Sequence, residues 1–467
     1  MSSNAPAAAR RVRPVNVAAA DTAVRRASDG VCYLQSRHAL EPYPRRLTER
    51  LEHWAARAGD RTFLAQRDDA GGWRTLTYAE ALAAARRIGS ALLERRLSAE
   101  RPVVILSGNG IEHALIALAA MHCGVPYAPL ATAYSLQSRD HATLRRIVDG
   151  LRPGLVFAAE GRGFERAIAA VLPPGAELVT SASAPEGMRA TPFTALASTA
   201  ATAAVDDAAA QVGPDTVAKI LYTSGSTGRP KGVVNTQRML CSNQAMLASV
   251  FPFLAEEPPV LCDWLPWNHT AGGNHNLGLV LNHGGTLHID EGKPVPGLIE
   301  KTVRNLRDIA PTIYFNVPRG YEALLPFLRE DAALRKTFFS RLGLLQYAAA
   351  VLPQPVLQAY EELAIQACGE RVLWITGYGA TETAPAAMFT SRGALRAGSV
   401  GLPVDGLEMK LAPVADKLEA RFRGPSGQPL GLNCNPALIR RSGESAPNIG
   451  SSRTQICTRR CFTSTRM

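Results

Sequence analysis

A loop of glycines and hydroxyl residues in the middle of the chain carries a single lysine. Residues 220–234 read Ile-Leu-Tyr-Thr-Ser-Gly-Ser-Thr-Gly-Arg-Pro-Lys-Gly-Val-Val, so one apolar run enters the loop and another leaves it. Glycines let backbone N–H groups approach phosphate oxygens closely. Hydroxyl groups add hydrogen-bond donors, and a lysine adds a point charge. The pattern predicts a polyphosphate-binding loop whose candidate ligands are Thr223, Ser224, Gly225, Ser226, Thr227, Gly228 and Lys231.

The loop is not a Walker motif, because Lys231 follows Arg229 and Pro230 rather than a glycine, and the next residue is not serine or threonine. A flexible polar linker between two strands is the alternative interpretation. Glycine/serine linkers seldom lead through Lys-Gly into a β-branched run such as residues 233–234. We therefore favour the phosphate loop.

A second apolar run, residues 372–376, leads into Gly-Tyr-Gly-Ala-Thr-Glu-Thr at residues 377–383. Ligands of open α/β sheets bind beyond the carboxyl ends of strands, so both loops are expected to meet one nucleotide. Tyr378, followed by Gly379, offers an aromatic face to a base, and Thr381 offers a hydroxyl to a phosphate. Glu382 offers a carboxylate that can hold Mg²⁺ on the polyphosphate. Taken alone, this segment also fits a simple strand-to-helix turn capped by threonine.

The phosphate loop resembles that of the adenylate-forming acyl-CoA synthetases, Thr-Ser-Gly-Ser-Thr-Gly-x-Pro-Lys-Gly, at every position. Within that family, Trp-Leu-Pro-Trp-Asn-His-Thr at 264–270 and Gly-Gly-Asn-His-Asn at 272–276 are similar to feruloyl-CoA synthetases. The resemblance implies ATP, Mg²⁺ and coenzyme A, and activation of an aromatic carboxylic acid such as a hydroxycinnamate to an acyl-AMP and then a thioester. It implies that Tyr378 stacks on adenine, Thr381 contacts the α-phosphate and Glu382 coordinates Mg²⁺.

Two further segments acquire roles through the same resemblance. The small residues Ala348 and Ala349 would let adenine lie against the backbone, whereas read alone they form a tightly packed turn. His269 would lie beside the acyl carboxylate and the route of the thiol, and its alternative is a structural histidine. A carboxylate that attacks a phosphate brings two anions together, so cations and oriented donors are needed where charge accumulates. The expected catalytic group is Lys231, Thr381, Glu382 and His269.

Two other functions stay open at this point. One is a catalytically silent ATP- or AMP-binding protein, and the other is a synthetase that acts on a fatty acid, an amino acid or another acid. Pyrophosphate release would separate the enzyme from the silent protein, and a panel of acids would separate the enzymes from one another.

Strands that alternate with helices along the chain predict an α/β fold with largely parallel sheets. The resemblance implies a large domain of two layered α/β sheets and a small β-barrel, which we assign to residues 31–425. Residues 1–30 are rich in alanine and arginine and are expected to form a disordered arm. Residues 181–210 show little periodicity and are expected to be a surface excursion.

The composition is that of an ordinary soluble globular protein, with 46% hydrophobic and 19% charged residues in 467. No apolar run reaches the ~18 residues of a membrane span. The eight cysteines lack metal-binding spacing and are expected to be reduced thiols of a cytoplasmic protein. Of the net charge of +11, the residues from Lys417 onward carry +7, from nine basic and two acidic side chains. The rest of the chain is nearly balanced, which argues against nucleic acid as a partner.

The likeness to the family runs from about Arg45 to Pro425. Residues 426–467 contain neither aspartate nor lysine, hold three of the eight cysteines and show no core-forming periodicity. The resemblance would place a ribose-binding aspartate and a small lysine-bearing C-terminal domain there. Our hypothesis is a frameshift near Ser426, and we expect the activity of this chain to be impaired. A basic tail that binds nucleic acid is the alternative.

Overall fold

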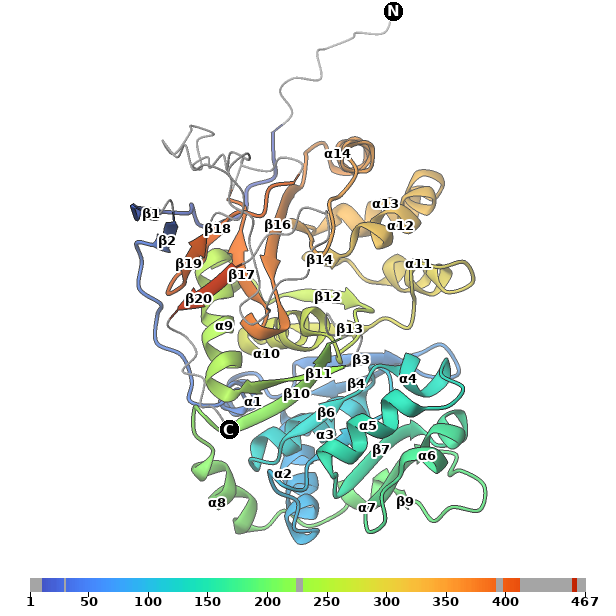
Figure 1. The fold of residues 1–467 in the computed structure, drawn as a ribbon. Coiled ribbons are helices and arrows are strands. Elements are labelled where there is room, and N and C mark those ends of the chain that lie inside the picture. Colours follow the sequence, from blue (N-terminus) through green and yellow to red (C-terminus); the bar gives the residue numbers. More distant parts are fainter. Residues whose placement is uncertain (1–10, 29–30, 224–229, 392–397, 412–455, 460–467) are drawn as a thin grey trace, which may run out of the picture.

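A seven-stranded sheet holds the strand that leads into the predicted phosphate loop (Figure 1). The computed structural model describes residues 11–28, 31–223, 230–391, 398–411 and 456–459. The strand order is β11-β10-β6-β5-β7-β8-β9, and all neighbours run parallel except β10 and β11. The strands are β5 (Val103–Ile105), β6 (Tyr127–Pro129), β7 (Leu155–Glu160), β8 (Glu177–Ala182), β9 (Thr191–Pro192), β10 (Val217–Thr223) and β11 (Lys231–Thr236).

Helices cover both faces of this sheet because successive strand residues point to opposite faces. Val103 and Ile105 pack into the core that contains α2 and α3, whereas Val104 packs into the core of α5 and α6. The helices of this half are α1 (Thr48–Arg57), α2 (Tyr78–Glu94), α3 (Ile111–His122), α4 (Thr132–Leu136), α5 (Ala142–Leu151), α6 (Glu165–Val171), α7 (Phe193–Ala197), α8 (Ala203–Gln211) and α9 (Gln237–Val250).

The second layer consists of two sheets that meet edge to edge. Their orders are β12-β13-β3-β4 and β14-β15-β16-β17-β18, and the N–H of Thr312 donates to the carbonyl of Val260 between them at 3.0 Å. The strands are β3 (Thr62–Arg67), β4 (Trp73–Thr77), β12 (Val260–Asp263), β13 (Thr286–Ile289), β14 (Ile313–Asn316), β15 (Leu344–Tyr347), β16 (Leu373–Gly379), β17 (Ala386–Phe389) and β18 (Leu402–Pro403).

Four helices gather on one side of β14, β15 and β16 (Figure 1). Their shared core is rich in aromatic rings, since Tyr321 lies 5.6 Å from Tyr314 and 5.0 Å from Trp374 between ring centroids. These helices are α11 (Ile299–Asp308), α12 (Pro318–Glu330), α13 (Ala332–Ser340) and α14 (Gln354–Cys368). The segment η4 (Ala271–Asn276), a π-helix, leads directly into α10 (Leu277–His283).

The expected β-barrel is replaced by an open antiparallel sheet. Its order is β1-β2-β19-β20, and within the described residues its first and last strands are not paired with each other. Its strands are β1 (Thr22–Arg26), β2 (Cys32–Ser36), β19 (Glu408–Leu411) and β20 (Ile456–Arg459). The α/β class and the two layered sheets are confirmed, and the barrel is the part that differs.

The predicted alternation of strands with helices along the chain is confirmed, for example in the strand-turn-helix units that begin with β5, β7 and β14. Residues 181–210 are less irregular than expected, because Phe193 and Leu196 anchor α7 and Val205 anchors α8 in the core. Cys123, Cys241, Cys262 and Cys368 are free thiols, but Cys32 is disulfide-bonded, which departs from the expectation of reduced cysteines. None of the described helices has the length and apolarity to cross a membrane.

The described part of the predicted disordered arm, residues 11–28, lies against the body. Its strand β1 pairs with β2, and Val12, Val15 and Val17 pack on the main core. The guanidinium of Arg13 donates to the carbonyls of Phe339 and Leu342 at 2.9 and 2.8 Å. Composition alone suggested disorder, whereas the spaced valines and one arginine hold residues 11–28 against the body of the protein.

We expect Arg13→Ala to lower the free energy of unfolding by about 1–3 kcal/mol, because two backbone carbonyls lose a charged donor. Urea denaturation measures the change. Arg37→Ala is the matched control, because Arg37 pairs with Asp21 where both side chains are more than half exposed (61% and 52%) and such pairs contribute little. Equal effects of the two substitutions would contradict the packed arrangement of the arm.

Candidate functional site

The predicted phosphate loop is closed by a pair of antiparallel strands. Thr223, the last residue of β10, lies directly opposite Lys231, the first residue of β11. Thr223 is half-buried and Lys231 is exposed. The loop ligands Ser224, Gly225, Ser226, Thr227 and Gly228 lie outside the described residues. The strand pair therefore holds the two ends of the loop directly opposite each other.

The second predicted segment forms the end of β16 and a short 3₁₀ turn, η5 (Thr381–Thr383). The N–H of Ala380 donates to the hydroxyl of Thr383 at 2.9 Å, which closes the turn. Thr381 is buried at 9% exposure, whereas Glu382 between two buried threonines is exposed. A Cβ on Gly379 would overlap the carbonyl of Pro385, so only glycine fits there.

The Ala348–Ala349 segment follows β15, the parallel neighbour of β16. Tyr347 lies opposite Thr376, and the hydroxyl of Thr376 donates to the carbonyl of Tyr347 at 2.8 Å. Ala349 adopts a left-handed backbone with φ of 76°. The two alanines therefore sit at the same sheet edge as Tyr378 and Gly379, one strand away.

The loop strand and the 3₁₀ turn also meet, although they are far apart in sequence. The side-chain amide of Asn235, on β11, donates to the carbonyl of Thr381 at 3.5 Å. Asn243, on α9, donates to the carbonyls of Thr383 and Ala386 at 3.0 and 2.9 Å. Lys231 and the Thr381–Glu382 turn thus belong to one hydrogen-bonded unit.

His269 lies in the turn before η4 and is exposed. Its Nδ1 accepts from the N–H of Ala271 at 3.2 Å, so one ring nitrogen orients the start of η4. Within the described residues, the hydrogen bonds of His269 do not reach the other predicted site residues. The adjacent Thr270 does connect to them, because its hydroxyl accepts from Asn274, which also donates to Asn235.

Sequence reasoning missed the buried polar residues behind the site. Asn235, Asn243 and Asn274 are each at most 2% exposed, and Lys219 is 2% exposed. Lys219 lies opposite Asn235 in the β10–β11 ladder, and its Nζ donates to the carbonyl of Gly273 at 3.1 Å. A polar residue within an apolar strand run was the available signal, as in Ala-Lys-Ile at residues 218–220.

Burial lowers the pKa of Lys219 to about 7. Within the described part of the chain its ammonium forms no ion pair with a carboxylate, and it lies 5.4 Å from the centroid of the Tyr127 ring. Desolvation disfavours the charged form of a buried lysine, so this direction follows from its position.

The only protein carboxylate offered to a metal by the predicted residues is that of Glu382. The described residues contain no cluster of three or more histidine, cysteine, aspartate or glutamate side chains that could hold a metal ion. Mg²⁺ commonly binds through one or two carboxylates together with substrate phosphates and water. One exposed carboxylate beside a phosphate loop therefore fits a Mg²⁺–nucleotide complex and does not fit an all-protein metal cage.

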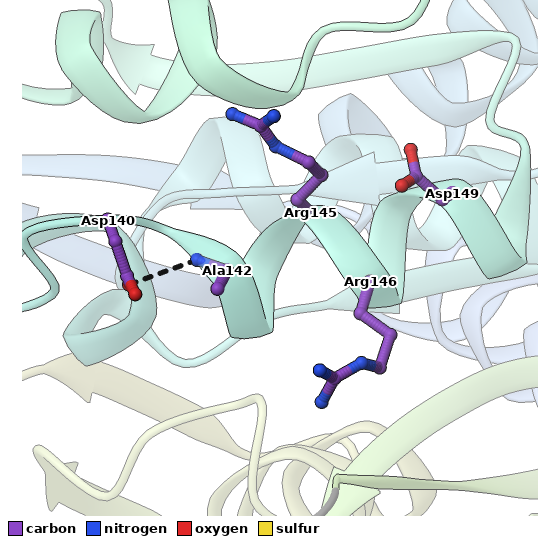
Figure 2. A pocket seen from close by; sticks show the side chains of 5 residues that line it. All are labelled: Asp140, Ala142, Arg145, Arg146 and Asp149. Carbon is purple, nitrogen blue, oxygen red and sulfur yellow. Dashed lines mark hydrogen bonds between the residues drawn. The ribbon is translucent and has the colours of Figure 1, made fainter.

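A hollow of about 420 Å³ on the surface of α5 is separate from these segments (Figure 2). Asp140, Arg145, Arg146 and Asp149 line it together with Ala142, whose N–H donates to Asp140 at 3.1 Å. Two arginines and two aspartates balance in charge, and none of the predicted site residues lines this hollow.

Known proteins resemble this chain in sequence and in fold. The sequence pattern of the AMP-binding enzyme family matches residues 51–427. A 3-hydroxybenzoate–CoA ligase of Aromatoleum sp. (strain CIB) is 28% identical over 348 residues, 74% of this chain and 61% of that protein. A feruloyl-CoA synthase of Amycolatopsis sp. is 30% identical over 225 residues, 47% of this chain and 39% of that protein.

Proteins named for other acids match at similar identity, among them malonate–CoA and long-chain-fatty-acid–CoA ligases. The chain spans between 33% and 61% of the length of these curated relatives. Among solved structures, a benzoate CoA ligase from Burkholderia xenovorans LB400 has a TM-score of 0.63 at 22% identity, over 82% of this chain and 72% of that one. This likeness shows the fold.

Lys219→Met should change the pH dependence of stability. The unfolded chain has a lysine pKa of about 10.4, so between pH 7 and about 10 it binds more protons than the folded chain does. The free energy of unfolding therefore rises with pH across this window, by at most about 1.4 kcal/mol per pH unit.

We expect the free energy of unfolding of Lys219→Met to lose this rise with pH. Relative to the unsubstituted protein, the variant should therefore be most stable near pH 7. Chemical denaturation at several pH values measures the slope, with the exposed Lys336→Met as control. An unchanged slope in Lys219→Met would show that the amine stays charged in the fold.

Proposed function

Because the chain belongs to the AMP-binding enzyme family, we propose that it activates a carboxylic acid with ATP and transfers the acyl group to coenzyme A. In the first step the acid carboxylate attacks the α-phosphorus of ATP, and pyrophosphate leaves to give acyl-AMP. In the second step the thiol of coenzyme A attacks the acyl carbon, AMP leaves, and the thiol loses its proton to give the thioester.

One observation carries this proposal: the mouth of the phosphate loop and the Thr381–Glu382 turn are joined by hydrogen bonds. Lys231 begins β11, and Asn235 on the same strand donates to the carbonyl of Thr381. A cation, a hydroxyl and a carboxylate are therefore carried by one unit. This combination suits a reaction in which an anion attacks a polyphosphate and a second anion leaves.

The residues of the chain have separate tasks in the proposed first step. Lys231 supplies positive charge to the polyphosphate, and Thr381 donates its hydroxyl to the α-phosphate. Glu382 holds Mg²⁺, which neutralises phosphate charge when bound. Tyr378 and Gly379 receive adenine against the backbone of Ala348 and Ala349, and the adjacent strand ends of β15 and β16 support this assignment. His269 lies on the acyl side.

We assign an aromatic acid of the hydroxycinnamate type as the substrate. The support is the likeness of residues 264–276 to feruloyl-CoA synthetases, together with relatives named for ferulate and 3-hydroxybenzoate. Malonate and fatty acids compete as assignments because relatives named for them match at similar identity. The free thiols of Cys123, Cys241, Cys262 and Cys368 support a cytoplasmic enzyme.

A panel of acids tests the reaction and its substrate together. Acid-dependent exchange of pyrophosphate into ATP should be fastest with ferulate, slower with 3-hydroxybenzoate, and slowest with malonate and palmitate. Thioester formation with coenzyme A is measured in parallel. Faster exchange with malonate or palmitate would contradict the aromatic assignment, and ATP binding without exchange for any acid would favour the silent nucleotide-binding protein.

Lys231→Ala and Glu382→Gln should each lower the exchange rate by about 10²–10³-fold, because each removes charge stabilisation from the transition state. Both residues are exposed, so thermal stability should change little. Arg145→Ala, in the hollow on α5, is a control for the loss of one exposed positive charge. A similar loss of rate in all three variants would show that general charge, rather than these positions, matters.

A further inference from the structure

A set of buried asparagines connects the parts of the candidate site. We propose that Asn235 and Asn243 are positioning residues that hold the Thr381–Glu382 turn in place relative to Lys231. This proposal rests on the proposed function, because it assigns the two amides a role in binding the Mg²⁺–ATP complex.

The two asparagines form hydrogen bonds with the first and the last residue of the turn η5. Asn235 donates to the carbonyl of Thr381 at 3.5 Å, and Asn243 donates to the carbonyl of Thr383 at 3.0 Å. Asn243 also donates to the carbonyl of Ala386 at 2.9 Å and accepts from its N–H at 3.1 Å. The side chain of Asn243 thus pairs with the backbone on the far side of the turn, as a neighbouring strand would.

Both asparagines come from one continuous unit, since β11 ends at Thr236 and α9 begins at Gln237. Lys231 is the first residue of that unit. A shift of the turn relative to Lys231 therefore requires the hydrogen bonds of these two side-chain amides to break. The distance between the lysine charge and the carboxylate of Glu382 is set by side-chain amides rather than by a shared sheet.

The amide of Asn235 is itself oriented by a second asparagine. Asn274 on η4 donates to the Oδ1 of Asn235 at 2.7 Å, which leaves the Nδ2 of Asn235 to face Thr381. The carbonyl of Asn274 in turn accepts from Gln244 at 2.7 Å. π-helical segments such as η4 occur frequently at functional sites, and here the segment fixes which end of the Asn235 amide meets the turn.

The exposure pattern separates a positioning role from simple core packing. Thr381 and Thr383 are buried at 9% and 8% exposure, while Glu382 between them is exposed. Asn235 and Asn243, together called the clamp, bond backbone carbonyls of the turn. They leave the carboxylate of Glu382 free to face a ligand. Misplacement of a reacting group by about 1 Å can cost about 100-fold in rate, so a loosened turn should impair Mg²⁺–ATP handling beyond its effect on stability.

The test compares Asn243→Ala and Asn235→Ala with Asn305→Ala in the full chain. Asn305 is an equally buried asparagine that bonds Asp290 and Arg67, neither of which is a candidate site residue. The measurements are the melting temperature, the rise in melting temperature on adding Mg²⁺–ATP, and the Mg²⁺ concentration for half-maximal pyrophosphate exchange.

We expect all three variants to melt at lower temperature. Only Asn243→Ala and Asn235→Ala should lose most of the stabilisation by Mg²⁺–ATP and need about tenfold more Mg²⁺ for exchange, with a KM for the acid that changes less. Normal stabilisation by Mg²⁺–ATP and unchanged Mg²⁺ dependence in these two variants would overturn the proposal.

Asn235→Ala removes a single long bond to the turn, so it tests the proposal if Asn243→Ala fails to fold. A Mg²⁺ response in Asn305→Ala equal to that of the clamp variants would also overturn it, because loss of stability would then explain the effect. If the unsubstituted chain binds Mg²⁺–ATP but supports no exchange, the proposed catalysis fails while the thermal measurement still tests the clamp. If it does not bind Mg²⁺–ATP, both proposals fail.

Discussion

The antiparallel pairing of β10 with β11 is the constraint on which the rest of the site depends. The other neighbours in the seven-stranded sheet are parallel, and a parallel strand would have carried the chain away through a crossover. The reversal instead returns Lys231 to the position opposite Thr223. The same ladder brings Lys219 opposite Asn235, four residues further from the loop. The register that closes the phosphate loop thus also aligns two buried polar side chains.

Those two side chains fasten η4 to the strand pair. Lys219 bonds the carbonyl of Gly273 and Asn235 bonds the amide of Asn274, so neighbouring residues of η4 meet neighbouring strands. Glycine at 273 is required, because a Cβ there would overlap the carbonyl of Trp267. A buried polar group is costly unless it is hydrogen-bonded. These two hydrogen bonds offset the cost of burying the side chains of Lys219 and Asn235.

The sequence predicted the helices and strands better than it predicted the buried contacts behind the candidate site. Glycine and hydroxyl residues predict a phosphate loop because their backbone requirements are local, and the alternation of strand and helix patterns predicts the α/β class for the same reason. A buried asparagine has no such local signature. Asn235 and Asn274 meet only in the fold, 39 positions apart in sequence. The open sheet in place of a barrel and the packed arm likewise depend on long-range pairing.

The division between exposed and buried groups has a consequence for how such a site can change. The side chains of Lys231 and Glu382 are exposed, while the side-chain amides of Asn235 and Asn243 that contact η5 are buried. Substitutions near η4 can reach the turn through the Asn274–Asn235 pair, and also through Gln244, which bonds the carbonyl of Asn274 from the helix that carries Asn243. Residues remote from these contacts can therefore vary while Lys231 and Glu382 keep their relative positions, provided that both connections are kept.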